Sequence, residues 1–289
     1  MSDEMVQDRA KAVAAAWWDD HYNGKRDPVW LWWESPEVSA YLGELVCGGP
    51  CSGTADLAVQ GIRRHCGEAL PFESAVSVGC GSAYKEIALL QAGVVRHFTL
   101  YDISEAALAA ARNRAESAGL AHAVTLVHGD PLERERGSFD LVYWDNSLHH
   151  MLNTRAALAW SRVRLKQGGH LVINDYVGPD RFQWSDDMLA RINEVIEPFG
   201  VEPTERENPR LIAKADPSEA ADSAATHDAL FGEFPDAVWT PMGGAIYHAG
   251  LTGKYTPLPG LIVARLMRID DMLNKAGMYV YAWATAVKE

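Results

Sequence analysis

A glycine-containing turn between two apolar runs constrains this chain more than any other feature. The apolar residues 75–78 run into Gly79 and Gly81, where the backbone can turn tightly because neither residue has a Cβ atom. A helix is predicted directly after the turn, and a second apolar run then ends in the carboxylate of Asp102. This order of strand, glycine turn, helix, strand and acid is typical of a βαβ unit that binds a nucleoside, in which the acid bonds the ribose hydroxyls.

Predicted strands and helices alternate through the centre of the chain. The predicted strands are residues 75–78, 97–102, 124–127, 139–144 and 170–175, and the helices between them include residues 84–91, 104–119 and 154–166. Gly168 and Gly169 are predicted to turn the chain into the last of these strands. Such alternation indicates a parallel sheet with helices on both faces. Beyond it, residues 179–235 read as helix and loop, followed by strands at 237–240 and 278–287 and a helix over residues 261–275.

The composition argues against several classes of partner. The chain has 39 acidic and 26 basic residues and a net charge of −13, so it lacks the basic face that nucleic-acid phosphates require. No apolar run reaches the roughly 18 residues of a membrane span, and the acidic N-terminus is unlike a signal peptide. We therefore expect no nucleic acid, no membrane partner and a cytoplasmic location.

The cysteines do not point to a disulfide framework or to a metal. Four cysteines in 289 residues are too few for a disulfide scaffold. The spacing of Cys47, Cys51, His65 and Cys66 is not that of a zinc module. Reduced thiols are therefore expected, and no metal is.

The turn at Gly79 separates two kinds of nucleotide site. A dinucleotide fold needs G-x-G-x-x-G, but the position of its third glycine is occupied by Tyr84. An apolar strand followed by Gly79 and Gly81 resembles instead the first motif, G-x-G-x-G, of the class I S-adenosylmethionine (SAM)-dependent methyltransferase family. Ala83 replaces the third glycine of that motif, and Ser77 stands where the family often has an acid.

Later motifs carry the same resemblance, which covers most of residues 73–178 and the C-terminal strand. Asp102 matches the family's ribose-binding acid, and Asp130 matches an acid that commonly meets the adenine amino group. Residues 139–150 resemble the fourth strand and the Leu-His-His that follows it in many small-molecule members. The resemblance implies a Rossmann-like, doubly wound α/β fold with seven strands, the last antiparallel, and SAM as the cofactor. It implies cofactor contacts at Ser77, Gly79, Cys80, Gly81, Asp102, Ile103, Asp130, Pro131, Asp145 and Asn146.

The chain is expected to consist of four segments. These are a helical N-terminal cap (1–72), a SAM-binding core (73–178), an inserted substrate lid (179–235) and a C-terminal completion of the core sheet (236–289). A further resemblance is to a bacterial subgroup associated with glycan and natural-product pathways. It is carried by residues 32–36, 175–184, 216–220 and 243–244.

Two histidines after the fourth strand are the candidates for catalysis. Methyl transfer from a sulfonium mainly requires alignment of the acceptor, and a hydroxyl or protonated amine also requires a base. His150 and His149 are expected at the carboxyl edge of the sheet, where ligands bind, and imidazole titrates closest to neutrality. The alternative is that one or both histidines cap or pack the following helix.

Other residues are candidates for contact with the acceptor or for closing the pocket. The predicted acceptor contacts are Tyr143, Asp175, Tyr176, Arg181 and Trp33. Asp145 and Asn146 either shape the methyl-transfer pocket or form an Asx turn. The N-terminal tryptophans Trp17, Trp18, Trp32 and Trp33 either form a lid or pack against the sheet.

Together these observations predict a SAM-dependent methyltransferase that acts on oxygen or nitrogen of a small molecule, as a monomer or homodimer. Two alternatives stay open. One is a SAM-binding fold without methyl transfer, and the other is an NAD(P)-dependent oxidoreductase.

Overall fold

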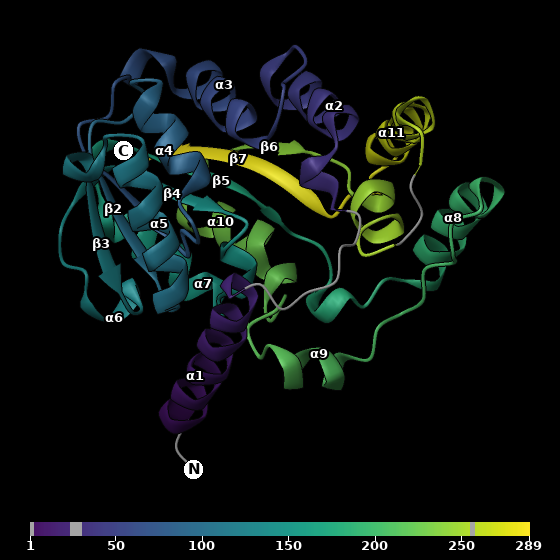
Figure 1. Cartoon of the computed structure of the whole chain (residues 1–289), viewed down its shortest axis with the longest axis horizontal. Helices are drawn as coiled ribbons and strands as arrows, with labels where there is room; N and C mark the ends of the chain where they lie inside the picture. Colours follow the sequence, from purple (N-terminus) through teal and green to yellow (C-terminus); the bar gives the residue numbers. More distant parts are fainter. Residues whose placement is uncertain (1–2, 24–30, 255–257) are drawn as a thin grey trace.

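One mixed sheet of seven strands, in the order β3-β2-β1-β4-β5-β7-β6, forms the centre of the molecule (Figure 1). The strands are β1 (Ala75–Val78), β2 (Phe98–Asp102), β3 (Val124–His128), β4 (Phe139–Asp145), β5 (Leu165–Tyr176), β6 (Val238–Pro241) and β7 (Tyr281–Val287). The computed structural model describes residues 3–23, 31–254 and 258–289, without the side chains of residues 3–6. Trp30, in the predicted N-terminal cap, lies outside the described residues.

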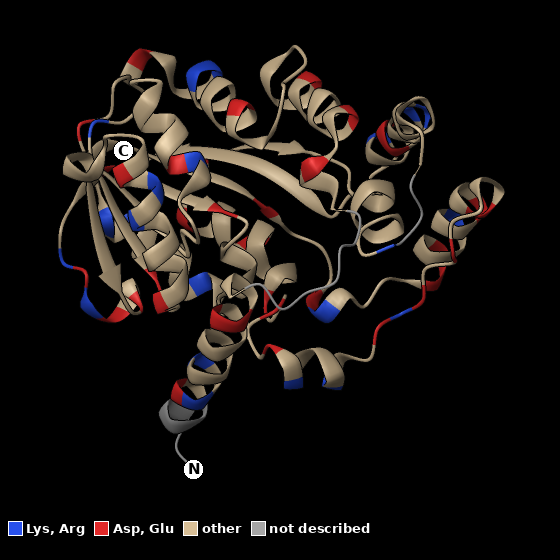
Figure 2. Ribbon diagram, in the orientation of Figure 1, with Lys and Arg blue, Asp and Glu red and all other residues tan. Residues whose placement is uncertain are grey.

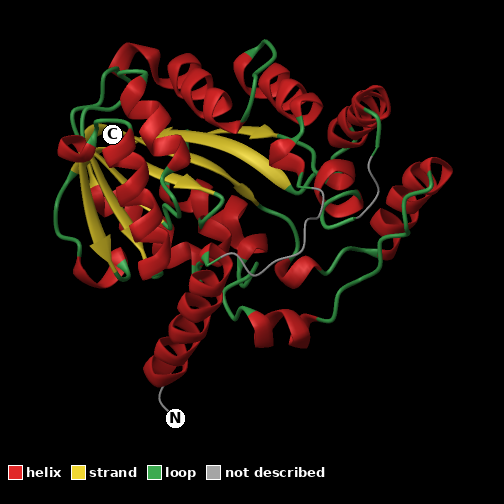
Figure 3. Cartoon of the chain, in the orientation of Figure 1, coloured by secondary structure: helices red, strands yellow, loops and turns green. Residues whose placement is uncertain are grey.

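Helices cover both faces of the sheet, as the alternation of elements predicted (Figure 3). The longer helices are α1 (Asp3–Tyr22), α2 (Pro36–Cys47), α3 (Thr54–Cys66), α4 (Tyr84–Gln91), α5 (Glu105–Ser117), α7 (Thr154–Arg164), α8 (Asp186–Ile196), α9 (Pro209–Ala215), α10 (Thr226–Glu233) and α11 (Gly260–Lys275). Helices α2 to α5 pack against one another on one side, and α7 packs with α10 on the other. The predicted Rossmann-like fold is confirmed.

The apolar strands are buried on both faces because alternate side chains enter two separate cores. On β4, Leu141 and Tyr143 belong to the core beneath α2 to α5, whereas Val142 and Trp144 belong to the core beneath α7 and α10. Side chains alternate across a strand, so a continuous apolar run satisfies both cores at once.

The C-terminal strand lies between β5 and β6 and runs antiparallel to both. It pairs His170 with Val287 at one end and Tyr176 with Tyr281 at the other. The antiparallel last strand implied by the family resemblance is therefore present. At the predicted turn, β5 includes both glycines, but Gly168 has a φ of 73° and the pairing with β4 shifts register between Leu165 and His170. The Gly168 amide donates to the carbonyl of Lys288 at 2.8 Å.

Helix ends are set by local capping. Ser104 accepts the amide hydrogen bond of Ala107 and begins α5, as its side chain predicts. Gly119 follows the end of α5 with a φ of 70°, a left-handed conformation that glycine adopts without strain. The segment between β2 and β3 thus follows the sequence pattern closely.

Charged groups are spread over many elements of the fold (Figure 2). Lys and Arg lie on helices on both sides of the sheet, and acidic residues are interspersed among them. Among the described residues, no helix combines the length and apolar character needed to span a lipid bilayer.

The contact between α3 and β7 allows a test of packing in the core beneath α2 to α5. A Cβ atom on Gly61 would lie 2.7 Å from the buried indole of Trp283, so the helix and strand approach through glycine. We expect Gly61→Val to lower the free energy of unfolding by about 1–3 kcal/mol, because overpacking displaces the indole. Urea unfolding followed by tryptophan fluorescence measures this. Gly67→Ala is the control, since a Cβ atom there meets no neighbour within 4 Å, and equal stabilities for the two variants would contradict the packing argument.

Candidate functional site

The turn after β1 has a backbone that favours glycine. Gly79 and Gly81 have φ angles of 65° and 53°. A Cβ atom would lie 2.8 Å from the Ser147 Cβ at the first position and 2.4 Å from the Tyr22 hydroxyl oxygen at the second. Ala83 also has a positive φ, 53°, which costs an L-residue roughly 1–2 kcal/mol. The position of the missing third glycine therefore keeps the conformation that a glycine adopts.

Asp102, at the end of β2, ties this turn to the next helix. Its Oδ2 accepts the Gly81 amide at 2.8 Å, and its Oδ1 accepts the Ser104 amide at 2.8 Å. Burial raises the pKa of this carboxyl group, and the backbone amides counteract part of that effect. The carboxylate also lines a cavity. Because each of its oxygens has two lone pairs, it can accept further hydrogen bonds from a ligand there.

A cavity of about 800 Å³ lies at the carboxyl ends of β1 to β5, a volume typical of a small-molecule site. The predicted cofactor residues that line it are Gly79, Cys80, Gly81, Asp102, Ile103, Asp130, Pro131, Asp145 and Asn146. The predicted catalytic and acceptor residues that line it are His149, His150, Tyr176 and Trp33. The structure thus brings together residues from the ends of the five parallel strands β1 to β5.

Ser77 is an exception among the predicted cofactor residues. It is buried in β1 and does not line the cavity, because its side chain points toward α4 and its Oγ donates to Glu86 Oε1 at 2.6 Å. Glu86 itself does line the cavity. Burial raises the pKa of Glu86 to about 7, so this carboxyl group can gain or lose a proton near neutrality.

Three predicted acceptor contacts are also absent from the cavity wall. Tyr143 is fully buried, with its hydroxyl donating to Asp145. Asp175 is fully buried below the loop that follows β4. Arg181 donates to the main-chain carbonyls of Asp216, Pro217 and Glu219. These three side chains hold other parts of the site in place.

Asp145 is engaged by protein partners. It forms an ion pair with Lys85 and accepts from Tyr143, and the side-chain amides of Asn146 and Asn174 donate to it at 2.8 and 3.2 Å. Four donors leave this carboxylate little capacity for a ligand. Its place in the cavity wall is therefore fixed by the protein itself.

His149 and His150 lie on a short helical turn after β4, with ring centroids 4.1 Å apart. Nδ1 of His149 contacts the Asp175 carboxylate, whose other oxygen accepts the amides of Ser147 and Leu148 at 2.8 and 2.6 Å. Nδ1 of His150 lies 3.1 Å from Ser218 Oγ. Each ring is thus held through Nδ1.

The two imidazoles differ in their pKa. Burial lowers the pKa of His149, but the Asp175 carboxylate outweighs burial and holds it above its usual value. Burial and the neighbouring His149 lower the pKa of His150. The adjacent rings are therefore not equivalent as proton acceptors.

The N-terminal helix α1 covers the cavity. Asp19 accepts from Ser104 Oγ at 2.6 Å, and Lys11 forms an ion pair with Asp130 at 2.7 Å. Trp18 meets the ring of His150 edge-on, with centroids 5.3 Å apart.

The N-terminal tryptophans divide between the two predicted roles. Trp17, Trp18 and Trp33 line the cavity, whereas Trp32 is buried in the core.

Several cavity residues were not predicted, and Tyr22, Lys85, Glu86 and Glu219 are among them. Lys85 and Glu86 carry a signal in retrospect, because they occupy the first turn of the helix that follows the glycine motif. Glu219 lies in the predicted lid and in the stretch 216–220 that carries the subgroup resemblance, but nothing in the sequence singles out its side chain.

Parts of this chain are similar in sequence or in structure to known proteins. Residues 76–171 match the family model described as Methyltransferase domain. The [4+2]-cyclase SpnF superposes with a TM-score of 0.51 and 18% identity, over 87% of this chain and 93% of that chain. The MccD protein gives a TM-score of 0.47 and 14% identity over 81% and 96% of the two chains. A SAM-dependent methyltransferase from Clostridium acetobutylicum gives 0.37 and 19% over 44% and 51%.

The family match spans β1 to β5, the part of the chain that carries the glycine turn, Asp102 and the histidine pair. The match to SpnF, in contrast, extends over nearly the whole chain and shows the fold. Over residues 76–171 the chain is therefore similar to a methyltransferase domain, and over nearly its whole length it has the fold of SpnF.

Proposed function

We propose that the protein transfers the methyl group of SAM to an oxygen or nitrogen atom of a small-molecule acceptor. The observation that carries this proposal is a single cavity lined by the glycine turn and Asp102 together with His149 and His150. A cofactor at the first group and an acceptor at the second would be neighbours, as in-line displacement at a methyl group requires.

The cofactor residues have distinct roles in this proposal. Asp102 accepts hydrogen bonds from the ribose hydroxyls with the lone pairs that the amides of Gly81 and Ser104 leave unused. Asp130 lies beside the adenine, where Lys11 and the Leu132 amide hold its carboxylate.

Glu86 supplies the charge that Ser77 lacks. The family often has an acid at the position of Ser77, and here the Glu86 carboxyl group lies 2.6 Å from the Ser77 hydroxyl. SAM carries an ammonium and a sulfonium, so a carboxylate in this wall of the cavity favours its binding. Glu86 would therefore be ionised when SAM is bound.

The acceptor would lie against His149 and His150, with α1 above it. Nε2 of each ring is the part that Asp175 and Ser218 leave available for an acceptor proton. Tyr176 and Trp33 supply apolar surface to the same cavity.

A second candidate is a reaction other than methylation on the same fold. It is favoured by the likeness to SpnF, which is a [4+2]-cyclase, because one fold can serve unrelated reactions. Binding of SAM alone does not separate these candidates, whereas turnover does.

The direct test combines calorimetric titration and label transfer. We expect SAM and S-adenosylhomocysteine to bind in a one-to-one ratio and NADH not to bind. A radiolabelled methyl group from SAM should appear in hydroxyl or amine acceptors. Binding of NADH without SAM would overturn the proposal, and SAM binding without transfer to any acceptor would favour the second candidate.

Asp102→Asn tests the cofactor end of the cavity. The variant loses the negative charge that accepts the ribose hydroxyls, a change of about 1.5–3 kcal/mol for hydrogen bonds to a charged group. We expect the Kd for SAM to rise about 10- to 100-fold in calorimetry. Glu116→Gln, which removes an exposed charge from the adjacent helix α5, should leave the Kd unchanged. Equal affinities for all three proteins would contradict the role of Asp102.

Glu86→Gln tests the buried acid by its effect on stability. The pKa of Glu86 rises from 4.5 to about 7 on folding, so the unfolded chain loses this proton first as the pH increases. The side chain therefore lowers the free energy of unfolding progressively between these two values, by about 3 kcal/mol in total. In urea unfolding of the cofactor-free protein, stability should fall across this window more steeply in the wild type than in Glu86→Gln.

Glu68→Gln is the control for this comparison, because Glu68 is exposed. Its pH profile should follow that of the wild type. Parallel profiles for the wild type and Glu86→Gln would show that Glu86 ionises normally in the fold.

A further inference from the structure

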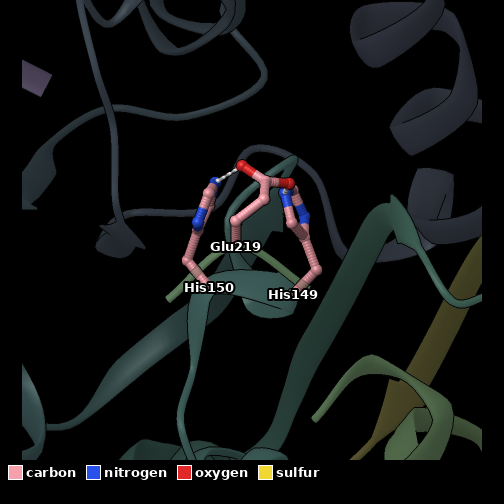
Figure 4. A group of neighbouring side chains, drawn as sticks. All are labelled: His149, His150 and Glu219. Atoms are coloured by element: carbon pink, nitrogen blue, oxygen red, sulfur yellow. Dashed lines mark ion pairs between the residues drawn. The ribbon is translucent and has the colours of Figure 1, made fainter. Parts of the chain in front are cut away.

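Three side chains in the cavity converge on one point (Figure 4). His149 Nε2 lies 3.7 Å from Glu219 Oε1, and His150 Nε2 lies 4.0 Å from Glu219 Oε2. The three ligand atoms lie within 4.8 Å of one another. Two imidazole nitrogens and a carboxylate thus face a common centre.

The opposite side of each ring is bound to an acceptor, which fixes the position of its proton. His149 Nδ1 faces the Asp175 carboxylate and must donate to it. Ser218 Oγ donates to Asp216 Oδ1 at 2.6 Å, so it accepts from Nδ1 of His150. When the two rings are neutral, the Nε2 atom of each therefore presents a lone pair to Glu219.

Such an arrangement lacks a positive charge at its centre. Asp175, Asp216 and Glu219 supply three carboxylates around the two rings. Asp216 Oδ2 is buried and has no hydrogen-bond partner among the described residues. Arg181, the neighbouring cation, donates its hydrogen bonds to main-chain carbonyls of residues 216–219. Buried lone pairs and carboxylates that face one another repel unless a cation lies between them.

We propose that His149, His150 and Glu219 bind a divalent transition-metal ion, to which the methyl acceptor is coordinated. Two imidazoles and one carboxylate suit Zn²⁺ or Fe²⁺ and leave coordination positions open. Carboxylate and hydroxyl partners on the Nδ1 atoms are the outer contacts that metal-bound histidines usually have. The sequence analysis predicted no metal, because it considered only the spacing of Cys47, Cys51, His65 and Cys66. Glu219 is distant from the two histidines along the chain and was not considered as a ligand.

Small side-chain movements are enough to form the site. Ligand atoms on one such ion lie about 3–3.5 Å apart, given metal–ligand distances of about 2.0–2.2 Å. The side chain of Glu219 is flexible, whereas its main-chain carbonyl is held by Arg181. Closing the cluster therefore needs movements of side chains rather than of the loop.

The role in the acceptor site rests on the proposed function. An acceptor with two neighbouring oxygen donors, such as a catechol or an α-hydroxycarboxylic acid, can occupy two open positions of the ion. Coordination lowers the pKa of its hydroxyl group, and the proton leaves to solvent. The oxyanion then forms the O–CH₃ bond as the S–CH₃ bond breaks, and the electron pair of that bond remains on the sulfur of S-adenosylhomocysteine. A protein base is then unnecessary.

The test is titration of chelator-treated, full-length protein with Co²⁺, followed by visible absorption without SAM. We expect one Co²⁺ per chain and ligand-field bands of a nitrogen and oxygen site. Glu219→Gln and His150→Ala should weaken binding at least about tenfold, and Asp175→Asn about 10- to 100-fold through His149. His122→Gln and Glu202→Gln, at exposed positions, are matched controls that should bind as the wild type does.

A second measurement does not depend on the variants. In nitrogen-15 NMR of the wild type, Zn²⁺ should shift two imidazole Nε2 signals and leave their Nδ1 atoms protonated. Failure to bind Co²⁺, or unchanged binding by a folded Glu219→Gln variant, would overturn the metal site. Two imidazolium rings that do not respond to Zn²⁺ would mean that protons fill the centre instead.

Turnover separates this inference from the proposed function. Metal-free protein should still bind SAM, because the cofactor residues lie elsewhere in the cavity, but should methylate a catechol only after Zn²⁺ or Fe²⁺ is restored. Full activity of the metal-free protein would overturn the role of the ion and leave methyl transfer intact. Co²⁺ binding without SAM binding would support the site and overturn the proposed function.

Discussion

The histidine end of the cavity depends on the buried carboxylate of Asp175. It lies at the end of β5, fully buried, and accepts the amides of Ser147 and Leu148 as well as Nδ1 of His149. A charge in this position is costly unless it is paired and fully hydrogen bonded. Burial raises the pKa of Asp175, but His149 and the amides outweigh burial and keep it below its usual value. The need to satisfy this carboxylate therefore fixes the loop after β4 and the direction of the His149 ring.

At the other end of the cavity, a different carboxylate stabilises the glycine turn in the same way. Asp102 accepts the amides of Gly81 and Ser104, so the glycine turn and the start of α5 are held at one group. Helix α1 then bonds to the same region through Asp19 and Ser104. At both ends of the cavity, an acid at the end of a strand accepts backbone amides and so fixes the neighbouring loop. Because the carboxyl ends of parallel strands meet at one edge of the sheet, these acids lie along the same cavity.

Local pattern explains why much of this could be predicted from the sequence. Continuous apolar runs between helices specify strands buried on both faces, and Gly79 and Gly81 lie where the backbone excludes a Cβ atom. The incorrect predictions concern the direction in which side chains point, and the missed residue is distant along the chain. Tyr143 and Asp175 were expected in the cavity because they end strands, but their side chains point below its wall. Glu219 lies in the segment predicted as the substrate lid, but its contact with the histidines depends on tertiary folding, so the sequence did not single it out.

The departures from the family motif are compensated in three dimensions rather than along the chain. Ser77 removes an acid from β1, yet Glu86 returns a carboxyl group to the same location from the first turn of α4. Ala83 removes a glycine, yet the backbone keeps the left-handed conformation at a modest cost. The replacement of glycine by Ala83 is tolerated because the alanine side chain is small. This side chain is fully buried. The glycine motif therefore describes a backbone path and a local charge, and different residues can supply each of them.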